Sequence, residues 1–121
     1  GKIMLNAITT GGSAEAYHEQ GRNRFTMREL LAPVDQTAHL CGMQFLAPFV
    51  VHGALSLTGR TTVAPHVERY VRLIDALRDN ELDLERARQA QELSSLIDEL
   101  PAYPRHDQAQ PPGATVPTHA P

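Results

Sequence analysis

The chain of 121 residues is long enough for one small domain, and its 41% hydrophobic and 21% charged residues are typical of a globular protein. A net charge of -3, with Arg22, Arg24 and Arg28 as the local basic cluster, argues against a nucleic-acid-binding protein, which usually carries a broad basic face. The longest apolar run, residues 45–51, is too short to cross a bilayer, and the single cysteine, Cys41, fits a reducing cytosol.

The last part of the chain differs in composition from the rest. Six of the nine prolines fall in residues 101–121, where Pro, Ala, Gln and Thr dominate. Such a segment cannot bury enough apolar surface to offset the entropy of ordering it. We therefore expect a disordered Pro-rich tail over residues 101–121 and a folded part over residues 1–100.

The first elements are a buried strand and a long loop. Residues 3–10 (IMLNAITT) are almost continuously apolar, as in a strand covered on both faces of a parallel sheet. This strand ends at Gly11 and Gly12. Residues 13–25 are polar and lack an apolar period, which predicts a loop with at most one helical turn. Loops of this length within a compact domain are often functional.

A helix and a second strand follow the loop. Thr26 and Glu29 have the spacing of a capping box, in which each side chain accepts a hydrogen bond from the backbone amide of the other residue. The helix that begins there can break at Pro33 and end at Gly42. Residues 45–51 then form a second apolar strand, and its Pro48, which lacks an amide proton, predicts an edge position.

Two amphipathic helices are expected after this strand. The first spans roughly 17 residues, ends near Asn80, and has an apolar stripe formed by Val63, Val67, Tyr70, Ile74 and Leu77. The second runs from about Leu84 to Pro101 with Asp83 as a possible cap, and its stripe comprises Ala87, Leu93, Ile97 and Leu100.

The order strand, helix, strand, helix, helix predicts an α/β fold, namely the C-terminal part of a parallel sheet with two strands and three to four helices. The first strand is apolar on both faces and requires neighbours at both edges, whereas the chain supplies one partner. We therefore expect a fragment whose missing strands precede Gly1. The alternative is that the chain borrows strands from another chain.

Ligands of doubly wound sheets bind beyond the carboxyl ends of the strands. The turn formed by Thr10, Gly11 and Gly12 lies at such an end. Two adjacent glycines let a flat or polar ligand approach the backbone and accept hydrogen bonds from its amides. A tight exit from the strand is the alternative interpretation of the same residues.

Several short motifs follow one another in a characteristic order over residues 1–77. They are Thr9-Thr10-Gly11-Gly12, Tyr17, Asn23-Arg24-Phe25, Leu30-Leu31-Ala32-Pro33, Cys41-Gly42-Met43, Leu46-Ala47-Pro48-Phe49 and His52-Gly53. The series resembles the C-terminal half of the flavodoxin-like NAD(P)H:quinone oxidoreductases, and in particular the bacterial glutathione-regulated potassium-efflux ancillary reductases.

This resemblance implies a five-stranded parallel sheet that binds FMN, takes hydride from NAD(P)H and reduces a quinone at the interface of a homodimer. It places four cofactor-binding residues against the isoalloxazine ring: Thr9, Thr10, Gly11 and Gly12. Tyr17 would lie at the pyrimidine edge of the ring, with a loop anchor as the alternative role. Mammalian members carry a histidine implicated in proton handling at the position of Asn23, and an asparagine cannot shuttle protons, so Asn23 is expected to hydrogen-bond or shape the loop.

Other consequences concern partners and function. The phosphate-binding loop of the fold follows the first strand of the sheet, and residues 1–121 contain no such loop, so this chain alone is expected to hold FMN poorly and to be inactive. No metal site is expected, because His39 and Cys41 point to different faces of a helix. Arg22, Arg24 and Arg28 could attract NADPH phosphates or an acidic partner, or simply form a solvated loop.

Three functions are therefore open at this point. The first is an FMN-dependent cytoplasmic quinone reductase with hydride transfer through the flavin N5 atom. The second, also implied by the resemblance, is a regulatory ancillary subunit of a glutathione-gated potassium-efflux antiporter, which would place the protein at the inner membrane surface. The third is a non-enzymatic helical interaction module.

Overall fold

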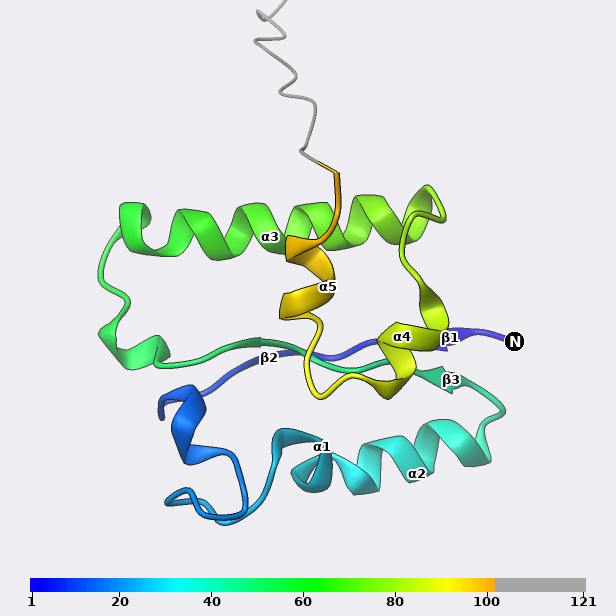
Figure 1. Ribbon diagram of the computed structural model, residues 1–121, viewed down its shortest axis with the longest axis horizontal. Helices are drawn as coiled ribbons and strands as arrows, with labels where there is room; N and C mark the ends of the chain where they lie inside the picture. Colours follow the sequence, from blue (N-terminus) through cyan, green and yellow to red (C-terminus); the bar gives the residue numbers. More distant parts are fainter. Residues whose placement is uncertain (102–121) are drawn as a thin grey trace, which may run out of the picture.

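In the computed structural model, which describes residues 1–101, two parallel strands run between helices on either side (Figure 1). Each strand is divided into two short segments. The first strand comprises β1 (Ile3–Met4) and β2 (Ala7–Thr9), and the second comprises β3 (Gln44–Phe45) and β4 (Phe49–Val51). β1 pairs with β3, and β2 pairs with β4, both in parallel. Helix α2 lies on one side of the strands and α3 on the other.

The second strand is interrupted at Pro48, and at this point it forms hydrogen bonds with the segment from Ala87 to Leu93. The amide of Ala47 donates to the carbonyl of Ala87 at 2.8 Å, and the carbonyl of Pro48 accepts from the amide of Leu93 at 3.0 Å. Because proline has no amide proton, this part of the strand cannot complete a sheet ladder on that side. The predicted edge position of Pro48 therefore holds, and the edge is covered by the segment from Ala87 to Leu93.

The helix after the first loop is divided as its sequence suggested. Its parts are α1 (Met27–Leu30) and α2 (Ala32–Leu40). The capping box is present, since Glu29 N donates to Thr26 Oγ1 and Thr26 N donates to Glu29 Oε1, both at 3.2 Å. Pro33 occupies the first turn of α2, where a missing amide proton costs no intrahelical hydrogen bond.

Helix α3 (Arg60–Arg78) agrees with the predicted helix, but its buried side differs from the prediction. Leu73 and Ala76 are its buried residues. The predicted stripe is exposed to solvent by 39–53% at its four N-terminal members, Val63, Val67, Tyr70 and Ile74. These side chains are open because, within residues 1–101, β2 is paired along one edge only.

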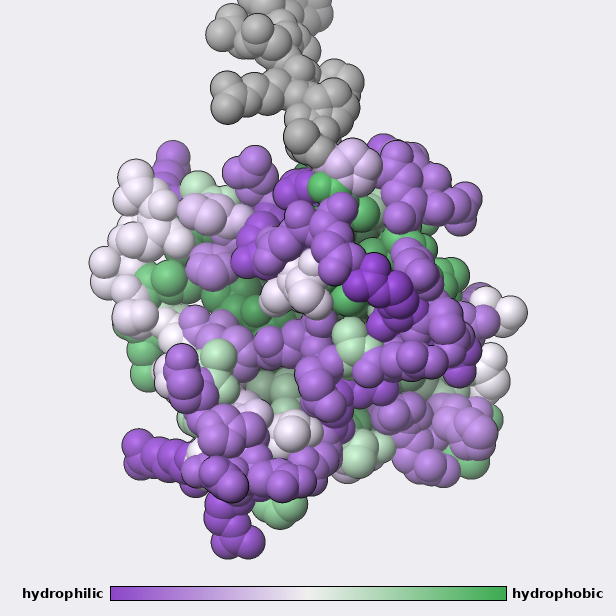
Figure 2. Space-filling model, viewed as in Figure 1, coloured by the Kyte–Doolittle hydropathy of each residue, from purple (hydrophilic) through white to green (hydrophobic). Residues whose placement is uncertain are grey.

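An apolar groove of about 440 Å³ lies between β2 and α3. Ile8, Phe49, Val67 and Tyr70 are among its lining residues. The groove is where the exposed stripe of α3 meets the strands. Figure 2 shows hydrophobic surface between α3 and the strands, on a face that is otherwise mostly polar.

The expected single helix over residues 84–101 is wrong. The segment forms two short helices, α4 (Leu84–Gln89) and α5 (Ser94–Asp98). Asp83 caps α4 as predicted, with Oδ1 accepting from the amide of Arg86 at 3.1 Å. The chain turns extended at Ala90 (φ -66°, ψ 157°), because the Leu93 amide is held by the second strand.

The core joins the second strand, α3 and the C-terminal segment. Its buried members are Leu46, Ala47, Phe49, Val51, Leu73, Ala76, Leu82, Ala87, Leu93, Leu96 and Ile97. Three of the predicted stripe residues of the last segment, Ala87, Leu93 and Ile97, are confirmed as buried. In residues 1–101 no helix combines the length and the apolar character needed to span a bilayer. The predicted Pro-rich tail lies outside the described residues from 102 onward.

Candidate functional site

The two strands end side by side, and the turn after the first strand is bonded to the segment after the second. The amide of Thr10 donates to the carbonyl of Val51 at 3.0 Å, and the amide of Ala54 donates to the carbonyl of Thr10 at 2.8 Å. The amide of Gly53 donates to the carbonyl of Gly12 at 2.8 Å. Gly53 has φ 67° and ψ 33°, a left-handed conformation that favours glycine. The carbonyls of Thr10 and Gly12 are thus satisfied by the chain itself.

The three amides that follow Thr10 have no such partners in the part of the chain that the structure describes. Gly11, Gly12 and Ser13 follow one another after the strand, and none of their amides donates a hydrogen bond within residues 1–101. Gly11 and Ser13 are exposed and Gly12 is half-buried. A run of unpaired amides at the carboxyl end of parallel strands is suited to a ligand that carries hydrogen-bond acceptors or negative charge.

Tyr17 lies over this turn. It follows the single helical turn in the loop, η1 (Ala14–Ala16), as the prediction of at most one turn requires. A β-carbon on Gly12 would lie 3.6 Å from Tyr17 Cε2 and 3.7 Å from its phenol oxygen. The ring of Tyr17 is 5.5 Å from the ring of His52, at an interplanar angle of 41°. The phenol is therefore next to the unpaired amides.

The remaining predicted site residues are placed differently. Thr9 lines the apolar groove beside α3, and Thr10 is buried, since successive side chains of a strand point to opposite faces. Asn23 is exposed, and its amide donates to the carbonyl of Ala16 at 3.0 Å. Thr10, Gly12 and Tyr17 thus meet in one place, while the Thr9 side chain is directed elsewhere.

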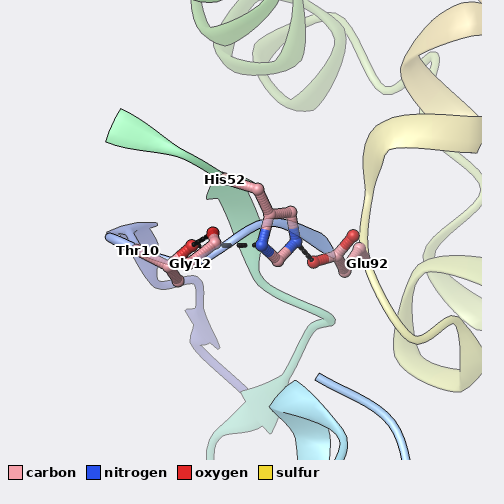
Figure 3. Close-up of polar contacts among 4 residues, drawn as sticks. All are labelled: Thr10, Gly12, His52 and Glu92. Carbon is pink, nitrogen blue, oxygen red and sulfur yellow. Dashed lines mark hydrogen bonds and ion pairs between the residues drawn. The ribbon is translucent and has the colours of Figure 1, made fainter. Parts of the chain in front are cut away.

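Sequence reasoning missed the residue at the centre of the site, His52. The hydroxyl of Thr10 donates to the carbonyl of Gly12 at 2.9 Å and lies 3.1 Å from Nδ1 of His52 (Figure 3). On the other side of the ring, Nε2 contacts a carboxylate oxygen of Glu92. His52 directly follows the second strand, at the edge where Thr10 follows the first, and this position was the available signal. The sequence offered no comparable signal for Glu92, because a continuous helix was expected around it.

Glu15 adds negative charge to the same region. Its pKa is lowered by the hydrogen bond from its own backbone amide, then by the Ser13 hydroxyl, and to a lesser extent by the charges of His52 and His18. The Glu15 carboxyl is fully exposed and stays ionised to lower pH than an ordinary glutamate. The site therefore has an acidic side chain from η1 in addition to Glu92.

Two members of the basic cluster, Arg24 and Arg28, have contacts outside this constellation. The Arg28 guanidinium lies over the ring of Phe45 at 5.5 Å and within 3.8 Å of the Asp35 carboxylate. Arg24 has a φ of 65° and lies over Phe25 at 5.9 Å. Arg28 thus contacts Phe45 and Asp35, which lie outside the site around His52. Over residues 1–101, no group of three or more His, Cys, Asp or Glu side chains is placed to hold a metal ion.

The loop that carries Tyr17 depends on Gly21. A β-carbon at Gly21 would lie 2.5 Å from the carbonyl oxygen of Glu15 and 2.6 Å from that of Ala16, so the backbone would have to move. We expect Gly21→Ala to weaken the local stability of the loop by about 1.4 kcal/mol, which makes opening about tenfold more frequent. Limited proteolysis within residues 13–25 measures this opening.

The matched control for this prediction is Gly12→Ala. A β-carbon at Gly12 has its nearest neighbour, Ala16 Cβ, at 3.6 Å, an ordinary van der Waals contact. Gly12→Ala should leave the cleavage rate of the loop unchanged. Equal cleavage rates for Gly21→Ala and the wild-type protein would show that the loop tolerates the side chain.

Comparison with known proteins identifies the fold family. A family model described as flavodoxin-like fold matches residues 1–74, which is more than half of the chain. The chain belongs to the flavodoxin-like fold family. The predicted α/β class and the resemblance drawn from the ordered motifs are confirmed by this match. The parallel pairing of the strands agrees with it.

Individual relatives support the same assignment to the flavodoxin-like family. The glutathione-regulated potassium-efflux system ancillary protein KefG of Erwinia tasmaniensis is 36% identical over 61 residues, covering 50% of this chain and 33% of the relative. General stress protein 14 of Bacillus subtilis is 42% identical over 53 residues, covering 44% of this chain and 30% of the relative. The chain thus spans about a third of the length of these curated relatives.

A solved structure is also similar. It is described as a thermophilic tryptophan halogenase from Streptomycin violaceusniger, and it matches with a TM-score of 0.54 and 30% sequence identity. The match covers 60% of this chain and 41% of the halogenase chain. The family match ends at residue 74, so Glu92 belongs to a segment beyond it.

Proposed function

We propose that residues 1–100 are the C-terminal part of a flavodoxin-like FMN-binding domain, and that the protein is an NAD(P)H:quinone oxidoreductase. The observation that supports this most strongly is the turn of Gly11, Gly12 and Ser13, whose three amides have no acceptor within residues 1–101. The turn lies at the carboxyl edge of parallel strands and beneath the phenol of Tyr17.

The chemistry of this turn fits an isoalloxazine ring. The ring is flat and carries hydrogen-bond acceptors, so it suits a surface where glycine lacks side-chain bulk and amides are free to donate. Donors placed near the pyrimidine part of a flavin stabilise the negative charge that arises on reduction. The residues present therefore fit the cofactor.

Each residue has a role in this proposal. Thr9, Thr10, Gly11 and Gly12 would hold the ring. Thr9, Gly11 and Gly12 would do so through backbone atoms at the strand end, and Thr10 would fix the Gly12 carbonyl through its hydroxyl. The Tyr17 phenol would donate a hydrogen bond at the pyrimidine edge. When bound, FMN would supply the group that accepts hydride from NAD(P)H and that passes two electrons to a quinone.

Asn23 is proposed to act beside Tyr17 without transferring protons. An amide side chain does not change its protonation state near neutral pH, so it can orient a substrate or fix the loop only through hydrogen bonds. Its exposed position in the loop after Tyr17 is compatible with contact to a bound quinone or nicotinamide.

The groove beside α3 supports the proposal that more of the domain packs on these residues. The exposed members Val63, Val67, Tyr70 and Ile74 form an apolar stripe on α3, next to an edge of β2 that is unpaired within residues 1–101. Burying such a face is strongly favourable, at about 25 cal/mol per Å² of apolar surface. We propose that further strands of the sheet, together with the phosphate-binding loop, complete the FMN site, and that two such domains form a homodimer.

A second candidate function is regulatory. Relatives such as the KefG protein of Erwinia tasmaniensis are named as ancillary proteins of a glutathione-regulated potassium-efflux system. This favours a protein that binds a potassium-efflux antiporter from the cytoplasmic side and lies at the inner membrane surface. The parallel strands and the family match favour either of these functions over the free-standing helical interaction module.

The decisive experiment for the first function uses the full-length protein. Purified protein titrated with FMN should reach one flavin per subunit and should then oxidise NAD(P)H with a quinone as acceptor. Absence of both flavin binding and quinone reduction would overturn the proposal. Potassium efflux measured in cells with and without the protein tests the second function, and efflux that does not change would argue against it.

A further inference from the structure

We infer that Glu92 and His52 form an ion pair that holds the turn of Thr10, Gly11 and Gly12 in the conformation that presents its free amides. The role is one of positioning: neither side chain is assigned to contact a substrate. The inference rests on the proposed function insofar as the turn is taken to bind FMN. Its structural part, the state of the pair and its hold on the turn, can be tested without a cofactor.

Counting protons shows why the pair is ionic. The Thr10 hydroxyl has one proton, and it lies in the 2.9 Å hydrogen bond to the Gly12 carbonyl, which can only accept. With that proton engaged, we assign Nδ1 of His52, 3.1 Å from the same hydroxyl oxygen, as a donor. Nε2 faces the Glu92 carboxylate, which also accepts. A ring that donates from both nitrogens is an imidazolium.

The His52–Glu92 contact lies in a partly enclosed part of the site. The His52 and Glu92 side chains are 15% and 26% exposed, so the pair is largely removed from water and is screened less than a surface pair. Glu15 on η1 interacts with His52 over a longer range, and the Tyr17 ring lies 5.5 Å from the His52 ring.

The geometry links the pair to the turn in a single chain of contacts. His52 reaches the hydroxyl of Thr10, and that hydroxyl reaches the carbonyl of Gly12, which also accepts from the amide of Gly53 (Figure 3). The Gly12 carbonyl is thereby directed back toward the protein. The Gly12 carbonyl and the Ser13 amide belong to one trans peptide group and point in opposite directions. Holding the carbonyl inward therefore directs the Ser13 amide outward.

Glu92 is held in place by the C-terminal segment. Its neighbour Leu93 is fully buried and donates its amide to the Pro48 carbonyl at 3.0 Å. The segment lies between α4 and α5, beyond residue 74, where the family match ends. In this chain the C-terminal segment therefore covers the edge strand and also supplies the anion that fixes the turn.

The test compares Glu92→Gln with Glu99→Gln in the full-length protein. Both changes replace a carboxylate of the C-terminal segment by its neutral isostere, and Glu99 pairs with Arg86 on the surface, away from the turn. Three quantities are measured at neutral pH: the protonation of the His52 ring by long-range ¹H–¹⁵N NMR, hydrogen exchange of the Gly53 and Ala54 amides, and the Kd for FMN.

We expect His52 to be protonated on both nitrogens in the wild-type protein and in Glu99→Gln, and on one nitrogen in Glu92→Gln. Exchange of the Gly53 and Ala54 amides, which bond to the carbonyls of Gly12 and Thr10, should become about tenfold faster in Glu92→Gln alone. The Kd for FMN should rise about tenfold in Glu92→Gln and stay within twofold in Glu99→Gln.

A second variant tests whether the two residues act together. His52→Asn places an amide donor near the Thr10 hydroxyl and loses the contact with Glu92. The effects of two residues that act as one unit are not additive. The double variant Glu92→Gln/His52→Asn should therefore have a Kd for FMN no higher than the larger Kd of the two single variants.

The outcomes separate this inference from the proposed function. A neutral His52 ring in the wild-type protein, or exchange rates that Glu92→Gln leaves unchanged, would overturn the inference. If Glu92→Gln changes the protonation of the His52 ring and speeds amide exchange but leaves the Kd for FMN unchanged, the link between the pair and the cofactor is overturned. If the wild-type protein binds no FMN, the proposed function fails, while the ring spectrum and the exchange rates still decide whether the pair holds the turn.

Discussion

Gly12→Val is expected to remove FMN from the full-length protein while its thermal unfolding stays cooperative. A β-carbon at Gly12 already lies 3.6 Å from the Ala16 β-carbon and from Cε2 of Tyr17. The two further methyl groups of valine would have to displace Tyr17 or cover the free amides. We expect the Kd for FMN to rise at least about a hundredfold, or about 2.7 kcal/mol, as measured by flavin absorbance of the dialysed protein.

The control for this prediction is again Gly12→Ala. Its single added methyl group makes ordinary contacts of 3.6–3.7 Å with Ala16 and Tyr17, so the Tyr17 ring can stay in place. This variant should retain most of its flavin and the same unfolding midpoint. If Gly12→Val keeps its yellow colour at full stoichiometry, the cofactor lies elsewhere and the proposed site is wrong.

Tyr17→Phe is expected to slow the reduction of bound flavin by NAD(P)H by roughly ten- to hundredfold. The change removes one hydroxyl donor, and loss of a donor to a developing anion in a buried site costs about 2.7–4 kcal/mol. Tyr17 is only half-buried, which reduces the expected effect to about 1.4–2.7 kcal/mol. Stopped-flow measurement of the half-reaction with NAD(P)H isolates this step from quinone reduction.

Tyr70→Phe is the matched control for Tyr17→Phe. Tyr70 also loses one hydroxyl, but it lies on α3, with its ring 5.5 Å from the ring of Phe49. Neither variant should change the Kd for FMN by more than a few fold, because the backbone amides of the turn remain. An unchanged rate of flavin reduction in Tyr17→Phe would assign Tyr17 the role of a loop anchor.

The sequence predicted those features that depend on neighbouring residues. The capping box of Thr26 and Glu29, the cap at Asp83 and the edge position of Pro48 each follow from local backbone chemistry, and each is present. The division of the second strand at Pro48 was not predicted. The order of the strands and helices, together with the motifs along residues 1–77, was enough to identify the flavodoxin-like family. Part of the candidate site could be predicted in the same way, because Gly12 and Tyr17 are close in sequence.

The tertiary structure decided what depends on contacts between distant segments. The buried side of α3 is formed by Leu73 and Ala76, because the available partners are the second strand and the C-terminal segment. The last helix is divided because the amide of Leu93 bonds to Pro48. His52 and Glu92 are 40 residues apart and meet only through this folded-back segment. A periodic pattern shows which side of a helix is apolar, whereas the choice of partner depends on the free energy of packing over the whole fold.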